Sequence, residues 1–250
     1  MGNFTGCLIF GSVVPRLRWV YSVPKSMMRN HPLLVSILLA LSLALPGPCP
    51  AQTPASKGLG IFEAATDIGA TRPGTTLYDP ATASYRVTGG GADLWGAADQ
   101  FHFTWLKLSG DATLSSDIHF APNTADPTAK AILIFRQSLD PDSPYADAAI
   151  HADGHITLQF RVTAGGLTED RNSPRHGATR LHIARKGDKF TLYAGPQVSQ
   201  MEPDPAPVVV ILHDPVYVGI GVCARNAGHL ETATFSNVKL DRPSRTSSAH

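Results

Sequence analysis

Six polar side chains are the residues of this chain with the clearest capacity for ligand chemistry. They alternate with apolar residues in short runs, so we expect each on the strand face opposite the hydrophobic core. Arginine and glutamine side chains bind hydroxyl and carboxylate groups through several hydrogen bonds at once. The pattern predicts one ligand-binding sheet face, with an ordinary solvated face as the alternative; its residues are Arg136, Gln159, Arg161, Arg180, His182 and Tyr193.

Trp95 is a seventh candidate for ligand binding. It follows the glycine run 89–91 and lies between Asp93 and Asp99. No lysine or helical pattern follows the glycines, so they predict a tight loop between strands rather than a phosphate-binding loop. An exposed indole can stack on the apolar side of a sugar ring while neighbouring polar groups bind its hydroxyls. The alternative is that Trp95 packs inside the loop.

The carboxylates show no catalytic pattern. Retaining glucanases on β-sandwich folds use two carboxyl groups about 5 Å apart, placed by an E-x-D-x-x-E motif. The chain has four glutamates, and none has this spacing: Glu63, Glu169, Glu202 and Glu231. The G-x-S-x-G motif of serine hydrolases is also missing from the sequence. We therefore predict no catalytic residues, and an unfamiliar hydrolase remains an alternative.

Histidine and aspartate do not predict a catalytic metal centre. The ten histidines are scattered without the ligand spacing of zinc sites. Four aspartates in turn-forming segments offer hard oxygen ligands, so a structural calcium ion is an alternative to our prediction of no cofactor. Turn formation is the favoured interpretation of these residues, which are Asp67, Asp79, Asp140 and Asp142.

The elements that must position the candidate residues are β-strands. Short runs rich in alternating or β-branched residues recur between turn-forming residues, and no segment keeps a helical period for three turns. The chain also has 22 glycines and 20 prolines, which is typical of a protein with many turns. The predicted strands are 60–63, 75–78, 84–88, 100–108, 112–120, 129–137, 145–151, 155–162, 179–186, 189–194, 207–212, 216–224 and 231–240.

Two tight hairpins are predicted from glycine-containing turns. Asp153 and Gly154 join one strand pair, and Gly187 and Asp188 join another. Such dipeptides supply the positive φ that tight hairpin turns need. Because strand and helix patterns do not alternate, a parallel α/β sheet is excluded, and the sequence predicts an all-β sandwich.

An export signal is predicted at residues 27–51. Arg29 precedes an apolar run from Leu33 to Leu45, and small residues at Cys49 and Ala51 place the cleavage site before Gln52. The apolar run has about 13 residues, fewer than the roughly 20 that span a bilayer. The mature chain is therefore expected without a transmembrane helix, in the periplasm or outside the cell. Lipid attachment at Cys49 is a weaker alternative, since Pro48 occupies the position before it.

The segment before this signal adds nothing that export requires, so we expect the true start at Met27 or Met28. Removal of the signal leaves Cys223 as the one cysteine of the mature chain, which predicts no internal disulfide. The first 51 residues hold four of the 21 basic residues and no acidic ones, so the remainder carries 17 − 20 = −3. A mildly acidic domain is a poor partner for nucleic acid.

Several segments resemble one known family. They include PGTTLYD from Pro73, YRVTGGGADLWG from Tyr85, FRQSLDPDSPYADAAIHADG from Phe135, and LHIARKGDKFTLY from Leu181. These segments are similar to the concanavalin A-like sandwich domains of bacterial proteins called TolB-like or biopolymer transporters. The resemblance covers nearly the whole expected mature domain and implies a concanavalin A-like antiparallel β-sandwich, or jelly roll. The wider superfamily includes lectins, glycan-binding modules and glucanases, so the fold alone does not assign a function.

Together these observations predict four segments: an N-terminal extension with signal (1–51), a linker (52–58), a β-sandwich (59–241) and a disordered tail (242–250). The predicted function is that of an exported non-catalytic binding module, with a carbohydrate or another cell-envelope polymer as partner. A structural or protein-interaction component related to Tol-type proteins is the alternative. The sequence does not determine the oligomeric state.

Overall fold

Two layers of antiparallel β-sheet form the domain, as seen in a computed structural model that describes residues 58–195, 203 and 205–243. Sheet A has seven strands in the spatial order β1 (Ala64–Ile68), β6 (Phe101–Leu108), β15 (Val216–Cys223), β8 (Lys130–Arg136), β9 (Tyr145–His151), β10 (Ile156–Arg161) and β11 (Glu169–Asn172). Sheet B also has seven, in the order β14 (Val208–Val209), β13 (Lys189–Ala194), β12 (Arg180–Lys186), β7 (Ala112–Phe120), β16 (Glu231–Asp241), β3 (Ser84–Gly89) and β2 (Thr75–Asp79).

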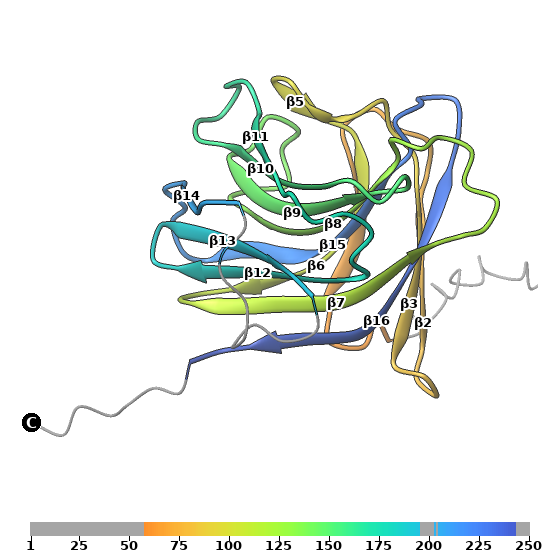
Figure 1. The fold of residues 1–250 in the computed structure, drawn as a ribbon, viewed down its shortest axis with the longest axis horizontal. Coiled ribbons are helices and arrows are strands. Elements are labelled where there is room, and N and C mark those ends of the chain that lie inside the picture. Colours follow the sequence, from red (N-terminus) through yellow and green to blue (C-terminus); the bar gives the residue numbers. More distant parts are fainter. Residues whose placement is uncertain (1–57, 196–202, 204, 244–250) are drawn as a thin grey trace, which may run out of the picture. The chain divides into compact units, whose positions relative to one another are not determined.

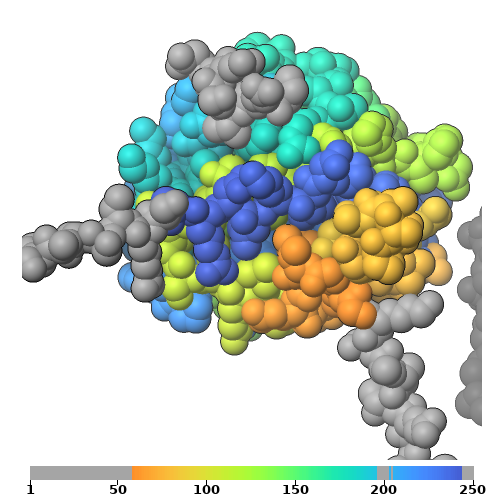
Figure 2. Space-filling model, turned by 90° about the horizontal axis from the view of Figure 1, so that it is seen from below, coloured from red at the N-terminus to blue at the C-terminus, as the bar shows by residue number. Residues whose placement is uncertain are grey.

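The main core fills the space between the sheets. Leu158 and Phe160 of β10 point into it, as do Ile183 of β12 and Leu192 of β13. These are the apolar positions of alternating runs, so the hydrophobic effect turns that face of each strand inward. Sheet B exposes alternate positions on its other side, and β16 lies at the surface there (Figure 2).

Sheet A is covered on its outer side as well. The cover consists of a hairpin, β4 (Leu94–Trp95) with β5 (Ala98–Asp99), and of loops 138–144 and 163–168; β5 lies above sheet A in Figure 1. Backbone hydrogen bonds join these pieces, since Asp99 N donates to Pro141 O (2.9 Å) and Thr168 N to Gly96 O (2.8 Å). All seven residues of β8 are therefore buried.

A second, smaller core lies between sheet A and this cover. Leu94 of the hairpin packs with Phe101 and Phe103 of β6, Ile132 and Ile134 of β8, and further apolar side chains. Burial on both faces explains why β8 reads as a nearly continuous apolar run, KAILIF, rather than as an alternating one.

Both predicted hairpins are confirmed. Strand β9 pairs with β10 across Asp153 and Gly154, where Gly154 has φ 94°. Strand β12 pairs with β13 across Gly187, with φ 59°. A residue with a Cβ is strained at such angles, which is why the turns select glycine.

Some strand boundaries differ from the prediction. The predicted strand at 60–63 is wrong, because β1 begins at Ala64. Strand β11 was not predicted, since its residues EDRN are all exposed and lack an apolar alternation. Strands β4 and β5 were also missed, because two residues are too few for a periodic pattern. Strand β14 is shorter than the predicted 207–212.

Cys223 is a free, buried thiol on β15, as expected for a small core residue, and burial raises its pKa to about 11. In the described part of the chain we find no helix with the length and hydropathy needed to traverse a bilayer. The predicted signal peptide, the linker up to residue 57 and most of the predicted tail, 244–250, lie outside the described residues.

Candidate ligand-binding site

The six predicted polar residues do not form one face. Arg136, Gln159 and Arg161 lie on β8 and β10 of sheet A, whereas the other three lie on β12 and β13 of sheet B. The expectation of a single surface is wrong, because period-two alternation assigns a side to each strand but does not say to which sheet the strand belongs. The outer sides of the two sheets point in opposite directions.

The sheet B residues are bonded to their own neighbours. Arg180 Nη1 lies 2.9 Å from Asp117 Oδ1. His182 accepts a hydrogen bond at Nδ1 from Ser115 Oγ (2.7 Å) and donates from Nε2 to Gly195 O (3.0 Å). Burial lowers the pKa of His182, so the ring is held neutral between these partners. Tyr193 is half-buried opposite His182 in the register of β12 and β13.

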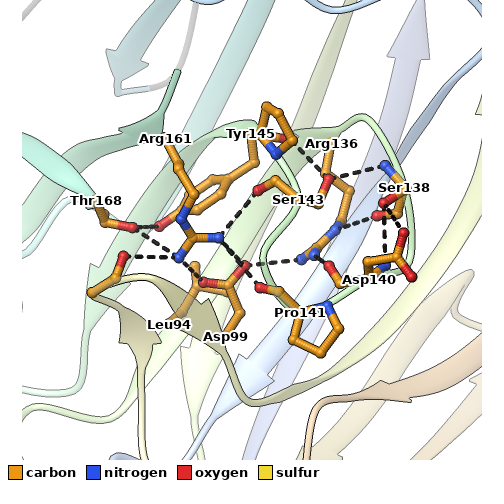
Figure 3. A network of polar contacts seen from close by, with 12 residues as sticks. Leu94, Asp99, Arg136, Ser138, Asp140, Pro141, Ser143, Tyr145, Arg161 and Thr168 are labelled. Atoms are coloured by element: carbon orange, nitrogen blue, oxygen red, sulfur yellow. Dashed lines mark hydrogen bonds and ion pairs between the residues drawn. The ribbon is translucent and has the colours of Figure 1, made fainter. Parts of the chain in front are cut away.

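Arg161 lies fully buried beneath the cover, contrary to the expected solvent-facing position. Its guanidinium binds both oxygens of Asp99, with Nη2 2.6 Å from Oδ1 and Nη1 2.9 Å from Oδ2 (Figure 3). It also donates to Gly166 O, Ser143 O and Gly96 O. Arg161 therefore joins sheet A to the hairpin and to both covering loops.

Arg136 has a similar role at the end of β8. It is fully buried, and it donates to Ser138 O and Asp140 O at 2.6 Å each, while its Nη1 lies 3.4 Å from Asp99 Oδ2. The same network includes Tyr145, whose hydroxyl lies 3.0 Å from Thr168 Oγ1 (Figure 3). Arg136 and Arg161 thus hold the cover in place, and neither lines a pocket described below.

The remaining two candidates, Trp95 and Gln159, lie at one pocket of about 330 Å³. The pocket opens on the outer side of sheet A, where hairpin β4–β5 ends. It is lined by Asp93, Trp95, Lys130, His151, His155, Thr157, Gln159, Asp170 and Arg225. Trp95 is 38% exposed, so the alternative of an indole packed inside the loop does not describe it fully.

An ion-pair cluster forms one wall of this pocket. Lys130 Nζ lies 2.9 Å from Asp93 Oδ1, 3.0 Å from Leu94 O and 3.4 Å from Gln159 Oε1. Arg225 makes an ion pair with the other oxygen of Asp93. The ammonium group also lies 5.3 Å from the centre of the Trp95 ring, within cation-π range. These contacts fix the indole at the rim.

Two buried polar atoms of the pocket residues have no hydrogen-bond partner within the described part of the chain: Thr157 Oγ1 and His151 Nε2. An unsatisfied buried group costs about 1–3 kcal/mol, which a ligand or an enclosed water can recover. The pKa of His151 is lowered to about 4 by burial and by the nearby Lys130 charge, so the ring is neutral at pH 7.

Asp147 of β9 is buried beside the pocket wall. Neither carboxylate oxygen has a hydrogen-bond partner among the residues that the structure describes. Burial raises the pKa of Asp147 well above its usual value, although the Lys130 charge opposes this shift. Burial of this kind favours the protonated form of a carboxyl group.

Most pocket residues were not predicted as a group. Five different segments supply Lys130, His151, Thr157, Asp170 and Arg225, and the pairing of β15, β8, β9, β10 and β11 in sheet A brings them together. The useful sequence signals were Trp95 beside Asp93 and the polar positions of β10. Nothing in the local pattern around Arg225 indicates that it reaches Asp93.

The described residues contain no cluster of three or more potential metal ligands. Three of the four aspartates considered for calcium have other partners. Asp79 accepts from Ala81 N (2.9 Å), Asp140 from Ser138 Oγ (2.9 Å), and Asp67 contacts His102 Nδ1 (2.7 Å). Turn formation and sheet contacts account for these three residues.

Comparisons with known proteins identify the fold. No family model matches the chain, and no curated protein matches its sequence. The chain is similar to a functionally unknown protein from Saccharomyces cerevisiae, at 17% identity and a TM-score of 0.55, over 72% of this chain and 96% of that one. The all-β sandwich of two antiparallel sheets that the sequence predicted is confirmed.

Weaker likenesses include two further solved structures. One is the carbohydrate binding module CBM66 from Bacillus subtilis, with 16% identity, a TM-score of 0.47 and coverage of 73% of this chain and 98% of that one. The other is the Bacillus licheniformis beta-glucanase, with 8% identity, a TM-score of 0.42 and coverage of 71% and 92%. At these identities the likeness concerns the fold alone.

Proposed function

We propose that the domain binds a carbohydrate in the pocket beside Trp95. The observation that carries this proposal is the combination of an exposed indole with buried polar atoms that lack a partner, Thr157 Oγ1 and His151 Nε2. A sugar ring presents an apolar C–H side to an aromatic ring and hydroxyl groups to polar atoms. The pocket volume lies at the lower end of the range for small-ligand sites, about 300–1,000 Å³.

Binding without hydrolysis is the activity that the carboxylates support best. Two-carboxylate hydrolysis needs one protonated acid and one free carboxylate beside the same bond. Asp93 is engaged by Lys130 and Arg225, which occupy both of its oxygens. Asp170 is the one other carboxylate among the described residues that line the pocket, and Asp147 does not line it. We therefore propose a non-catalytic module.

Replacing Trp95 with alanine tests the site. We expect the affinity for the bound glycan to fall about tenfold, because the stacking surface is lost while the polar groups remain. Binding is measured by isothermal titration with a ligand found on a glycan array. Tyr193→Ala is the matched control, since it removes a partly exposed aromatic ring from the outer side of sheet B. Loss of binding in Tyr193→Ala alone would place the site on sheet B.

We also propose that the domain acts after export, in the periplasm or outside the cell, as the signal pattern before Gln52 predicts. The resemblance to TolB-like sandwich domains agrees with such a location. When the full chain is expressed in a bacterial host, mass spectrometry of the mature protein should find Gln52 at its N-terminus. An Ala51→Arg variant should stay uncleaved, because signal peptidase sites need a small residue there. A wild-type protein that keeps the preceding residues would contradict this proposal.

A further inference from the structure

The hydrogen bonds already made inside the pocket determine which sugars it can accept. We propose that the site selects uncharged sugars with free hydroxyl groups and rejects the corresponding uronic acids. This inference rests on the proposed carbohydrate site, and it adds the chemical class of the ligand. Its basis is the donor and acceptor state of His151, Thr157 and Lys130.

His151 can only accept a hydrogen bond at its free nitrogen. Its Nδ1 lies 3.2 Å from the carbonyl oxygen of Thr128. A carbonyl accepts and never donates, so the ring proton is on Nδ1, and Nε2 carries a bare lone pair. This lone pair is the buried atom without a partner in the described structure. A sugar hydroxyl supplies the proton it needs, whereas a carboxylate brings only further lone pairs.

Thr157 adds a second position for a hydroxyl group. Its residue is 1% exposed, and Oγ1 lacks a hydrogen-bond partner within the described ranges. A threonine hydroxyl donates one hydrogen bond and accepts others, so it matches a sugar hydroxyl, which does the same. Thr157 and His151 lie on the paired strands β10 and β9, so a single sugar ring can form hydrogen bonds with both side chains.

Lys130 would be the natural partner for an acidic sugar, but its donors are committed. An ammonium group has three N–H donors, and Asp93 Oδ1, Leu94 O and Gln159 Oε1 are within hydrogen-bond distance of Nζ. Arg225 is paired with the second oxygen of Asp93. The pocket charges balance, with Lys130 and Arg225 against Asp93 and Asp170. Among the described residues that line the pocket, a ligand carboxylate would therefore be desolvated beside cations whose charges are already balanced.

His151 Nε2 remains a hydrogen-bond acceptor over most of the pH range. Burial, Lys130 and His155 lower the pKa of His151 to about 4, and Asp153 opposes them. The other charged groups lining the pocket are Asp93, Asp170 and Arg225. Above about pH 4 Nε2 remains an acceptor, so the preference for uncharged sugars is expected at pH 7.

The experiment uses the mature protein on an array of neutral and acidic glycans at pH 7. It is followed by titration with matched polymer pairs that differ at C6, namely β-glucan with polyglucuronate, mannan with polymannuronate, and galactan with polygalacturonate. For any pair that binds, we expect the neutral member to bind at least about tenfold more tightly. Tighter binding of a uronate would contradict the preference for uncharged sugars but would leave the proposed carbohydrate binding intact. If no glycan binds on the array or in titration, the proposed function itself fails.

Variants at His151 test the assigned atom. His151→Lys replaces the acceptor with a charged donor, so the ratio of neutral to uronate affinity should fall about tenfold or more. His151→Gln, which keeps an acceptor oxygen, should retain part of the preference. His213→Lys is the control for added charge, because this exposed histidine contacts Gln137 at the opposite end of β8. Melting temperatures check that each variant folds. If His151→Lys fails to fold, the inference is decided by the ratio of neutral to uronate affinity in the wild type and in Thr157→Val.

Discussion

Replacing Arg161 with methionine is expected to lower the free energy of unfolding by about 3–5 kcal/mol, because a buried charge loses its partner. Asp99 and Arg161 are both fully buried, and each Asp99 oxygen accepts from the guanidinium. The substitution leaves Asp99 with the more distant Arg136 at 3.4 Å. It also removes the hydrogen bonds that Arg161 donates to the hairpin and the two loops. Urea denaturation monitored by tryptophan fluorescence measures the loss.

Two further variants distinguish this mechanism from a general loss of packing. The double variant Arg161→Met with Asp99→Leu should be more stable than the sum of the single effects predicts, since no unpaired carboxylate remains. Arg180→Met, which removes a partly exposed ion pair with Asp117 on sheet B, should cost no more than about 1 kcal/mol. A cost below 1 kcal/mol for Arg161→Met would show that the cover does not depend on the buried arginine.

Replacing Asp147 with asparagine is expected to raise the free energy of unfolding at pH 7 by about 1 kcal/mol or more, since each unit of pKa shift is worth about 1.4 kcal/mol. In the folded protein burial raises the pKa of Asp147 well above its ordinary value of 3.8, which favours the protonated carboxyl group. As the pH rises from the unfolded pKa toward the folded pKa, folding takes up a proton at this residue, and this uptake opposes folding. Asparagine has a similar shape and does not titrate.

The sign of this effect depends on pH. Because the folded pKa is raised, the unfavourable contribution of Asp147 is absent below about pH 4 and grows as the pH rises toward the folded pKa. The advantage of Asp147→Asn over the wild type should therefore be larger at pH 7 than at pH 4, as measured by urea denaturation at both values. A variant that is less stable than the wild type at pH 7 would show that Asp147 is ionised and paired with Lys130.

Sequence periodicity predicted the architecture well, for a physical reason. In β10 the apolar Leu158 and Phe160 alternate with Gln159 and Arg161, and the structure places the first pair in the main core. The turn glycines Gly154 and Gly187 likewise fixed both hairpins, because a positive φ is a local requirement. Such signals depend on neighbouring residues, so they can be interpreted without knowledge of the fold.

The site was harder to predict, because it depends on contacts between distant segments. The polar residues of β10 predicted solvent exposure, but a hairpin about 60 residues earlier in the chain covers Arg161. Asp99 of that hairpin compensates the buried charge of Arg161. Arg180 and His182 have the same alternating pattern and lie on the other sheet. A long apolar run such as β8 was the available sign that sheet A is buried on both sides.

The cover over sheet A separates the residues that stabilise the fold from the residues that form the pocket. The sandwich between the sheets maintains the fold, whereas a short hairpin held by arginines carries Trp95 and one wall of the pocket. Because this hairpin contributes only Leu94 to the inner packing, its exposed residues are free to diversify under selection for new sugars. A directed-evolution library restricted to residues 95, 97 and 98, which leaves Gly96 with its φ of 61° unchanged, would therefore explore specificity at little risk to the scaffold.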